Sequence, residues 1–169
     1  MKVLALICQK GGTAKTTTAI NLAVEAMAYG LEVAVIDLDP QVSACDWKDI
    51  RGDDRPPVVV ATPVPHLARA LKAAADNGAD LVLVDTAGRT NDAAIAAARV
   101  ADLVLIPLQP SLIDLKTLAS TLEIIRLGGN RPARALLARV KAAGTRHEAT
   151  TAWLQEQGGR SVRPCWGSA

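Results

Sequence analysis

Phenylalanine is absent from this 169-residue chain, and aromatic residues make up only 2% of it, although half of its residues are hydrophobic. A buried core must therefore consist of the aliphatic side chains of valine, leucine, isoleucine and alanine. A chain of this length can bury such a core within one folded unit. We accordingly expect a single domain that spans residues 1–169.

Long hydrophobic runs are missing as well. No apolar run approaches the roughly 18 residues that are needed to cross a bilayer. The N-terminus also has no basic region followed by a long apolar stretch and a cleavage site. These absences argue against a membrane-spanning or secreted protein and favour a cytoplasmic one.

Cysteine and histidine are scarce and scattered. Cys8, Cys45 and Cys165 lie far apart, without C-x-x-C spacing or a histidine cluster beside them, so we expect reduced thiols rather than disulfide bonds or metal ligands. His66 and His147 each stand alone, and an isolated histidine is more often a solvated surface residue than a catalytic one. A metal site built from cysteine and histidine is therefore not expected.

Neither sign of charge dominates, because the net charge is only +2. From Pro110 onward, however, there are nine basic residues against four acidic ones, whereas the preceding part has ten basic and thirteen acidic residues. A basic C-terminal third is compatible with a surface that contacts nucleic acid. A solvated face is the commoner meaning of scattered arginines, so charge alone leaves both interpretations open.

Short apolar runs recur along the chain, and most are continuous, which is typical of strands that are covered on both faces. Between them lie alanine-rich segments with apolar residues at helical spacing. The expected strands are Val3–Cys8, Val33–Ile36, Val58–Ala61, Leu81–Val84, Leu103–Ile106 and Leu136–Val140. The expected helices are Thr16–Tyr29, His66–Asn77, Asn91–Val100 and Leu112–Leu127. This alternation predicts an α/β fold with a doubly wound, mostly parallel sheet and helices on both faces.

The segment Gln9–Thr17 lies between the first expected strand and the first expected helix, which is where a phosphate-binding loop belongs. Gly11 and Gly12 allow the backbone to turn its N–H groups inward toward phosphate. Lys15 can reach the β- and γ-phosphates, and the Thr16 hydroxyl can bind Mg²⁺. The segment therefore predicts binding of a nucleoside triphosphate together with Mg²⁺.

The loop departs from the general pattern G-x-x-x-x-G-K-[ST], because Gln9 and Ala14 occupy its two glycine positions. A left-handed backbone at Ala14 would cost about 1–2 kcal/mol, and its methyl group can crowd the phosphates. An additional lysine, Lys10, gives the sequence K-G-G-x-x-K-T-T, which resembles the deviant Walker A motif of the ParA/MinD family of partitioning and positioning ATPases. The resemblance extends over roughly Met1 to Val140.

This resemblance implies a P-loop NTPase fold that forms one ATPase domain and binds a nucleotide. In the family, the early lysine reaches across a dimer interface to the nucleotide of the partner, which is the role expected for Lys10. The expected nucleotide-binding residues are Lys10, Gly11, Gly12, Thr13, Ala14, Lys15, Thr16 and Thr17.

Acidic residues end two of the expected strands, where open α/β sheets place their sites. Asp85 follows four apolar residues and fits a carboxylate that holds Mg²⁺ directly or through water, with Gly88 freeing the next loop to sense the γ-phosphate. By the resemblance, Asp39 lies beside the metal and orients or activates the attacking water, whereas Asp37 braces the site. The expected metal-site residues are Thr16, Asp39 and Asp85, and the expected catalytic residues are Lys10, Lys15 and Asp39.

The resemblance also implies a function. It predicts a slow, Mg²⁺-dependent ATPase that acts in plasmid or chromosome partitioning, with ATP and Mg²⁺ as cofactors. In this family ATP drives formation of a homodimer, the dimer binds nonspecific DNA, and a centromere-binding protein of the ParB type stimulates hydrolysis. No membrane contact is expected, because the C-terminus is short and interrupted by proline. The expected location is the cytoplasm, with nucleoid association if DNA is bound.

The end of the chain departs from the family. Members continue through a further strand and terminal helices, whereas Val162–Ala169 has no helical period, so we expect this part of the domain to be missing after about residue 162. Together with Ala14, this leaves open a nucleotide-binding remnant or module without turnover. A metabolic P-loop synthetase that transfers phosphate to a small carboxylate, as in cobyrinate amide formation, is a second alternative. ATP consumption that requires a small acid would distinguish it.

Overall fold

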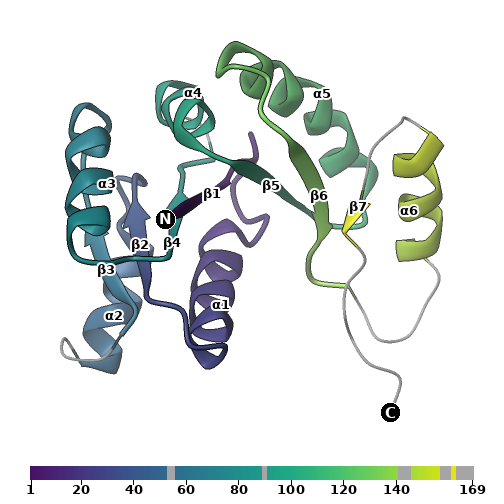
Figure 1. Cartoon of the computed structure of the whole chain (residues 1–169). Helices are drawn as coiled ribbons and strands as arrows, with labels where there is room; N and C mark the ends of the chain where they lie inside the picture. Colours follow the sequence, from purple (N-terminus) through teal and green to yellow (C-terminus); the bar gives the residue numbers. More distant parts are fainter. Residues whose placement is uncertain (53–55, 89–90, 141–145, 157–160, 163–169) are drawn as a thin grey trace.

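A computed structural model describes residues 1–52, 56–88, 91–140, 146–156 and 161–162, which form a parallel β-sheet with helices on both sides (Figure 1). The strands are β1 (Lys2–Leu6), β2 (Val33–Asp37), β3 (Val58–Ala61), β4 (Leu81–Asp85), β5 (Leu103–Leu108), β6 (Ala133–Leu137) and β7 (Ser161–Val162). The helices are α1 (Lys15–Ala28), α2 (Ser43–Arg51), α3 (Leu67–Asp76), α4 (Asn91–Val100), α5 (Leu112–Leu127) and α6 (Arg146–Glu156), and a 3₁₀ helix, Val64–His66, precedes α3. The α/β fold predicted from the sequence is confirmed.

Within the described residues, the strands lie in the order β3-β2-β4-β1-β5-β6-β7, and each pair is parallel. Leu4 of β1 lies opposite both Leu83 of β4 and Leu103 of β5. The chain builds one side of the sheet from β2, β3 and β4 and then crosses to the other side with β5, so the strand order reverses beside β1. Open α/β sheets bind ligands at such a point, outside the carboxyl ends of the strands.

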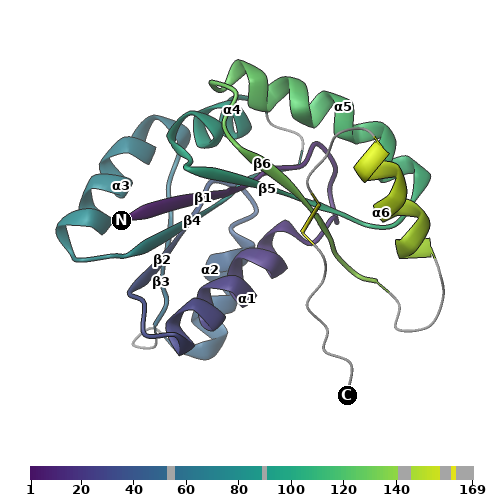
Figure 2. The same ribbon diagram turned by 45° about the vertical axis from the view of Figure 1, so that its right-hand side comes forward.

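Helices α1 and α2 cover one face of the sheet, and α3, α4 and α5 cover the other (Figure 2). Each layer has its own aliphatic core. The core under α1 and α2 includes Leu6, Val35 and Leu83, and the core on the opposite face includes Ile36 and Ile106. The central strands are therefore buried on both faces, as their continuous apolar runs predicted.

Small residues bring α4 and α5 close together. Ala94, Ala97 and Ala98 of α4 are buried, and a Cβ atom on Gly128, directly after α5, would collide with the side chain of Ala98. Interiors are close-packed, so a close approach of helices compensates for the small volume of these side chains. A chain without phenylalanine can fill its core in this way.

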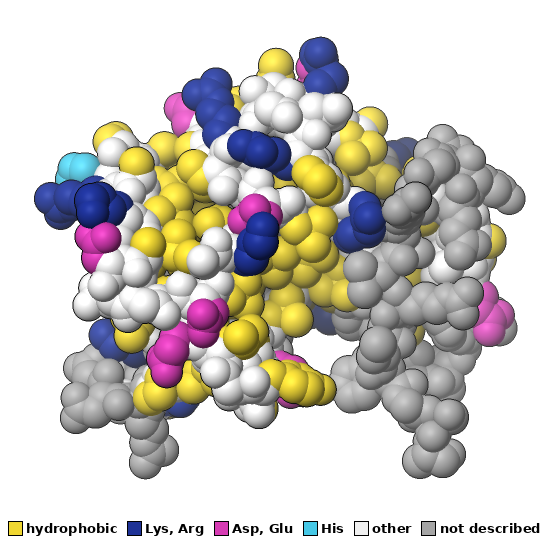
Figure 3. Space-filling view, in the orientation of Figure 1, with side chains coloured by type: hydrophobic (Ala, Val, Ile, Leu, Met, Phe, Trp, Pro, Cys, Tyr) yellow, Lys and Arg dark blue, Asp and Glu magenta, His cyan; other side chains and the backbone are white. Residues whose placement is uncertain are grey.

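Some hydrophobic side chains remain exposed. In the view of Figure 3 they lie across the centre of the molecule, and basic and acidic side chains are interspersed around them. Tyr29 and Ile50 are 79% and 87% exposed, and Val58 and Val60 of β3 are 61% and 41% exposed. No helix in the described part of the chain is both long and apolar enough to cross a membrane.

Four elements were not expected from the sequence, namely α2, α6, β7 and the 3₁₀ helix Val64–His66. Helix α2 has the polar sequence SACDWKDIR and buries only Ala44, so its apolar period is too weak to indicate a helix. The position of β6 also differs. It spans Ala133–Leu137 rather than Leu136–Val140. Ala133–Leu137 pair with Val104–Leu108 of β5, and the backbone is left-handed at Arg139 (φ 54°), beyond the end of the strand.

The cysteines behave as expected where the structure describes them. Cys8 is buried, Cys45 is partly buried, and both are free thiols. His66 is exposed. Among the described residues, no group of three or more histidine, cysteine or acidic side chains forms a metal site. Cys165, the side chain of His147 and the terminal segment 163–169 lie outside the described residues.

Candidate nucleotide site

The segment between β1 and α1 forms a turn whose backbone is left-handed at two positions. Gly12 has φ 74°, and Ala14 has φ 71° and ψ 28°. Ala14 precedes Lys15, the first residue of α1, where no side chain caps the helix and no acidic residue lies in the first turn. The first N–H groups of α1 are thus left for another acceptor, and together with the helix dipole they favour an anion.

Hydrogen bonds hold the turn in this shape. The Lys10 carbonyl accepts hydrogen bonds from the Lys15 ammonium group at 3.0 Å and from the Thr13 hydroxyl at 3.4 Å. The side-chain amide of Gln109, in the loop after β5, donates to the Gly12 carbonyl at 2.8 Å. Lys15 is only 7% exposed. The loop thus holds a largely buried cation beside the helix N-terminus, where it would meet phosphate oxygens.

Gly88, in the loop after β4, packs directly against this turn. A Cβ atom at Gly88 would lie 2.7 Å from the carbonyl carbon and oxygen of Lys10 and 2.8 Å from the nitrogen of Gly11. Because all of these are backbone atoms, a side chain at Gly88 must displace one of the two loops. The loop after β4 therefore supports the shape of the turn before α1.

Asp37 of β2 and Asp85 of β4 lie directly opposite each other in the sheet register. Asp37 accepts hydrogen bonds from the backbone N–H of Asp39 at 2.9 Å and from that of Ala44, in the first turn of α2, at 3.0 Å. Burial raises the pKa of Asp37, and these two backbone hydrogen bonds oppose the rise. Both of its oxygens therefore brace the segment around Asp39 and the start of α2.

Asp85 has no comparable partners. Its side chain is fully buried, and neither carboxylate oxygen has a hydrogen-bond partner among the described residues. Burial raises the pKa of Asp85 to about 7. The Thr16 hydroxyl, which is nearby but does not complete a hydrogen bond, and the Lys15 ammonium group both oppose this rise. A buried carboxylate without partners is costly unless a cation or donor joins it. An acidic oxygen beside a hydroxyl oxygen fits Mg²⁺, which prefers oxygen ligands.

A cleft of about 680 Å³ opens over the turn. It brings together residues from the turn, from α1 and from the loops after β2, β4 and β6. The lining residues are Gly11, Gly12, Ala14, Lys15, Thr16, Thr17, Asp39, Pro40, Gln41, Ala87, Gly88 and Arg139. Of the expected site residues, Lys10, Thr13 and Asp85 do not line the cleft, and Thr13 and Asp85 are buried.

The sequence profile of the CobQ/CobB/MinD/ParA nucleotide binding domain matches residues 4–164. The chain belongs to this family. The maintenance of carboxysome distribution protein A of Gloeobacter kilaueensis is 38% identical over 141 residues, which cover 82% of this chain and 63% of that protein. The chromosome-partitioning ATPase Soj of Thermus thermophilus is 33% identical over 164 residues, which cover 79% and 66%.

Solved structures agree on the fold. The cobyrinic acid a,c-diamide synthase of Mycobacterium smegmatis, with bound ADP and magnesium, has a TM-score of 0.76 at 20% identity, over 93% of this chain and 82% of that one. The chain spans about half to two thirds of the length of the curated relatives that it matches. The family predicted from the deviant Walker A motif is confirmed, because curated relatives bear the names Soj and ParA.

Arg139 lines the cleft but is not among the site residues expected from the sequence. It follows β6, is exposed, has a left-handed backbone and lines the cleft. A basic residue after an apolar strand is too common a pattern to indicate a site. Arg139 adds a second cation, besides Lys15, to the lining of the cleft.

Replacement of Ala14 by glycine tests whether alanine weakens the loop of this family member. The left-handed backbone at Ala14 is part of the folded loop itself, so relief of strain affects folding more than binding. Glycine also increases the freedom of the unfolded chain, which offsets the relief. We expect Ala14→Gly to change the free energy of unfolding by less than about 1 kcal/mol and ATP affinity by less than about fivefold. Urea unfolding and ATP titration measure both, and a much tighter complex would instead show that the methyl group crowds the phosphates.

Proposed function

We propose that the chain is a Mg²⁺-dependent ATPase of the ParA type, built as one P-loop domain, which acts in partitioning of a plasmid or chromosome. The observation that carries the proposal is the turn before α1, with its two left-handed residues and buried Lys15, together with the unpartnered carboxylate of Asp85, whose raised pKa Lys15 and Thr16 oppose. The family of the chain, and the chromosome-partitioning ATPase among its relatives, support the proposal.

Each expected site residue has a role in this proposal. The amide groups of the turn and Lys15 bind the phosphates of ATP, with Thr16 and Asp85 holding Mg²⁺ directly or through water. Bound Mg²⁺ neutralises charge on the phosphate oxygens. Asp39 lines the cleft, and its carboxylate accepts a hydrogen bond from the Gln41 N–H at 2.9 Å. In the proposal, Asp39 helps to hold Mg²⁺ and orients the water that attacks the γ-phosphate.

Lys10 acts in trans in the proposed mechanism. As in the family that the motif resembles, its ammonium group serves the nucleotide of the partner in an ATP-bound homodimer, and its absence from the lining of its own cleft is compatible with this role. Supplying one cation through a partner is an effective switch, since phosphoryl transfer depends on positioning and charge stabilisation. The ATP-bound dimer holds nonspecific DNA, and a ParB-type centromere-binding protein stimulates hydrolysis.

Replacement of Lys10 by alanine tests the role in trans. We expect Lys10→Ala to bind ATP as the unmodified chain does, within about threefold, but to lose ATP-dependent dimerisation and most of its turnover. Size-exclusion chromatography with light scattering, with ATP and Mg²⁺, measures the dimer. The matched control is Lys72→Ala, which removes an exposed lysine from α3 that pairs with Asp76. A normal ATP-dependent dimer in the Lys10 variant would contradict the proposed role.

Turnover separates the proposal from its alternatives. The experiment is a measurement of phosphate release from ATP and Mg²⁺, with and without nonspecific duplex DNA and with a panel of small carboxylic acids. Slow hydrolysis that DNA stimulates supports the partition ATPase. Binding of ATP without turnover in any condition points to a nucleotide-binding module, and turnover that requires a small acid points to a synthetase.

A further inference from the structure

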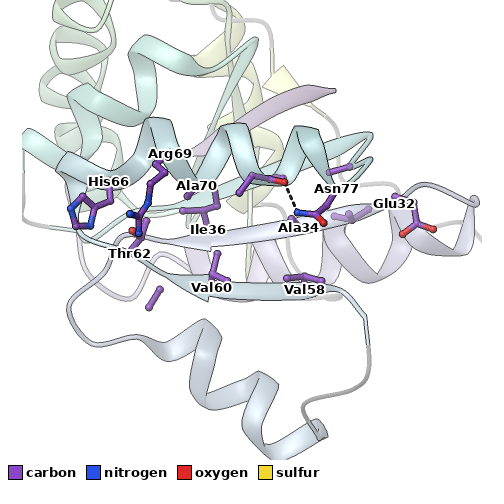
Figure 4. Close-up of a pocket in the computed structure, with 15 residues that line it drawn as sticks. Glu32, Ala34, Ile36, Val58, Val60, Thr62, His66, Arg69, Ala70 and Asn77 are labelled. Carbon is purple, nitrogen blue, oxygen red and sulfur yellow. Dashed lines mark hydrogen bonds between the residues drawn. The ribbon is translucent and has the colours of Figure 1, made fainter.

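A second hollow, which we call the β3 groove, lies between α3 and the two strands at the edge of the sheet, β2 and β3 (Figure 4). Its volume is about 570 Å³, and it shares no lining residue with the nucleotide cleft. Apolar side chains line both of its sides. Those on the strands are Ala34, Ile36, Val58 and Val60, and those on α3 are Ala70, Ala73 and Ala74.

The groove is open because the facing side chains of α3 are too small to fill it. Ala70 lies opposite the strands, Val58 and Val60 point from β3 toward α3 (Figure 4), and Ala73 also lines the groove. These two valines remain 61% and 41% exposed. Adjacent exposed valines on a hollowed surface favour an apolar occupant, because covering them removes apolar area from water.

The two ends of the groove carry opposite charges. Arg69, His66 and Thr62 lie at one end, and Glu32 and Asn77 lie at the other (Figure 4). The guanidinium group of Arg69 extends from α3 toward Thr62, and it forms no ion pair or hydrogen bond with another described residue. An anion is therefore attracted to the Arg69 end and repelled from the Glu32 end.

We propose that the β3 groove binds a small amphiphile, with its apolar chain along Val58 and Val60 and its anionic head at Arg69. The volume is within the range of small-molecule pockets, which are mostly apolar with a few polar groups that fix orientation. The five residues from Val58 to Thr62 span about 13 Å of extended strand, which suits a medium-length acyl chain. The opposite charges at the two ends give such a ligand a single favoured direction.

Titration of the full chain with sodium decanoate, below the concentration at which it forms micelles, tests this proposal by calorimetry. We expect saturable binding of one decanoate. Arg69→Gln removes the charged partner of the head and should weaken binding about tenfold. Ala73→Leu fills the groove and should abolish binding, whereas Arg99→Gln makes the same charge change outside the groove and should leave it unchanged.

Each result has a defined meaning. Equal affinity in the Arg69→Gln variant, or saturable binding that survives Ala73→Leu, would place decanoate elsewhere and overturn the proposal. Absence of saturable binding by the unmodified chain would also overturn the proposal. So would self-association of the chain through β3, if decanoate did not reverse that association. Circular dichroism of each variant verifies its fold, and Arg69 and Ala73 are both exposed, so their replacement leaves the core intact.

Discussion

Replacement of Asp85 by asparagine is expected to stabilise the nucleotide-free protein at pH 8, although it removes a residue of the proposed site. Burial raises the pKa of the Asp85 carboxyl from its ordinary value of 3.8 to about 7. The folded protein thus binds this proton more tightly than the unfolded chain does, so the contribution of Asp85 to stability falls as the pH rises from about 4 to about 7. Above pH 7 the buried carboxylate is charged, and the loss is complete.

The size of the effect follows from the two pKa values. The difference between 3.8 and about 7 corresponds to about 4 kcal/mol, which is the largest gain expected from the neutral asparagine at pH 8. At pH 4 the two proteins should differ little. Urea unfolding of both proteins at pH 4 and pH 8 measures the difference, and equal stability at pH 8 would contradict a buried, unpartnered carboxylate.

The same substitution should have the opposite effect on ligand binding. Asp85→Asn removes the charged oxygen ligand that we assign to Mg²⁺, so ATP with Mg²⁺ should stabilise the variant far less than it stabilises the unmodified chain. Thermal unfolding with and without ATP and Mg²⁺ compares the two. A variant that is more stable alone but less stabilised by ligand is the signature of a site residue held at a cost to the fold.

Replacement of Gly88 by alanine is expected to reduce ATP affinity by at least about tenfold. The new Cβ atom would lie 2.7 Å from the backbone of Lys10, so the phosphate-binding turn or the loop after β4 must move. Overpacking of this kind also costs about 1–3 kcal/mol of folding stability. Isothermal titration with ATP and urea unfolding measure the two effects.

Gly11→Ala is the matched control for the effect on stability. A Cβ atom on Gly11 meets no atom within 4 Å, and its backbone is not left-handed, so its free energy of unfolding should hardly change. If Gly88→Ala were as stable as Gly11→Ala and bound ATP normally, the two loops could not be in the tight contact described here.

The elements that the sequence predicted share one property, which is a clear apolar pattern: a continuous apolar run in the strands and apolar residues at helical spacing in the helices. Leu81–Val84 differs from β4 by a single residue, and Asn91–Val100 coincides with α4. Helix α2 depends instead on a tertiary contact. Its first turn is held by the hydrogen bond from the Ala44 N–H to the carboxylate of Asp37, which no local pattern of polar residues reveals.

The candidate site likewise has parts that the sequence predicted and parts that it did not. The order of Lys10, Gly12 and Lys15 in a short segment is visible in the sequence, because a phosphate-binding turn is local. The contact between Gln109 and Gly12 joins residues 97 positions apart, and it exists only because β5 lies beside β1 in the sheet. Such supports of the turn follow from strand order, so the sequence alone could not identify them.

The most direct test of the central claim is the affinity of the unmodified chain and of Lys15→Ala for ATP, measured by calorimetry in the presence of Mg²⁺ and again with excess EDTA. We expect the unmodified chain to bind one ATP, with weaker binding in EDTA, and we expect Lys15→Ala to lose at least about tenfold in affinity. Equal affinity of the two proteins, or a folded chain that binds no ATP, would contradict the assignment of the turn before α1 as a nucleotide site.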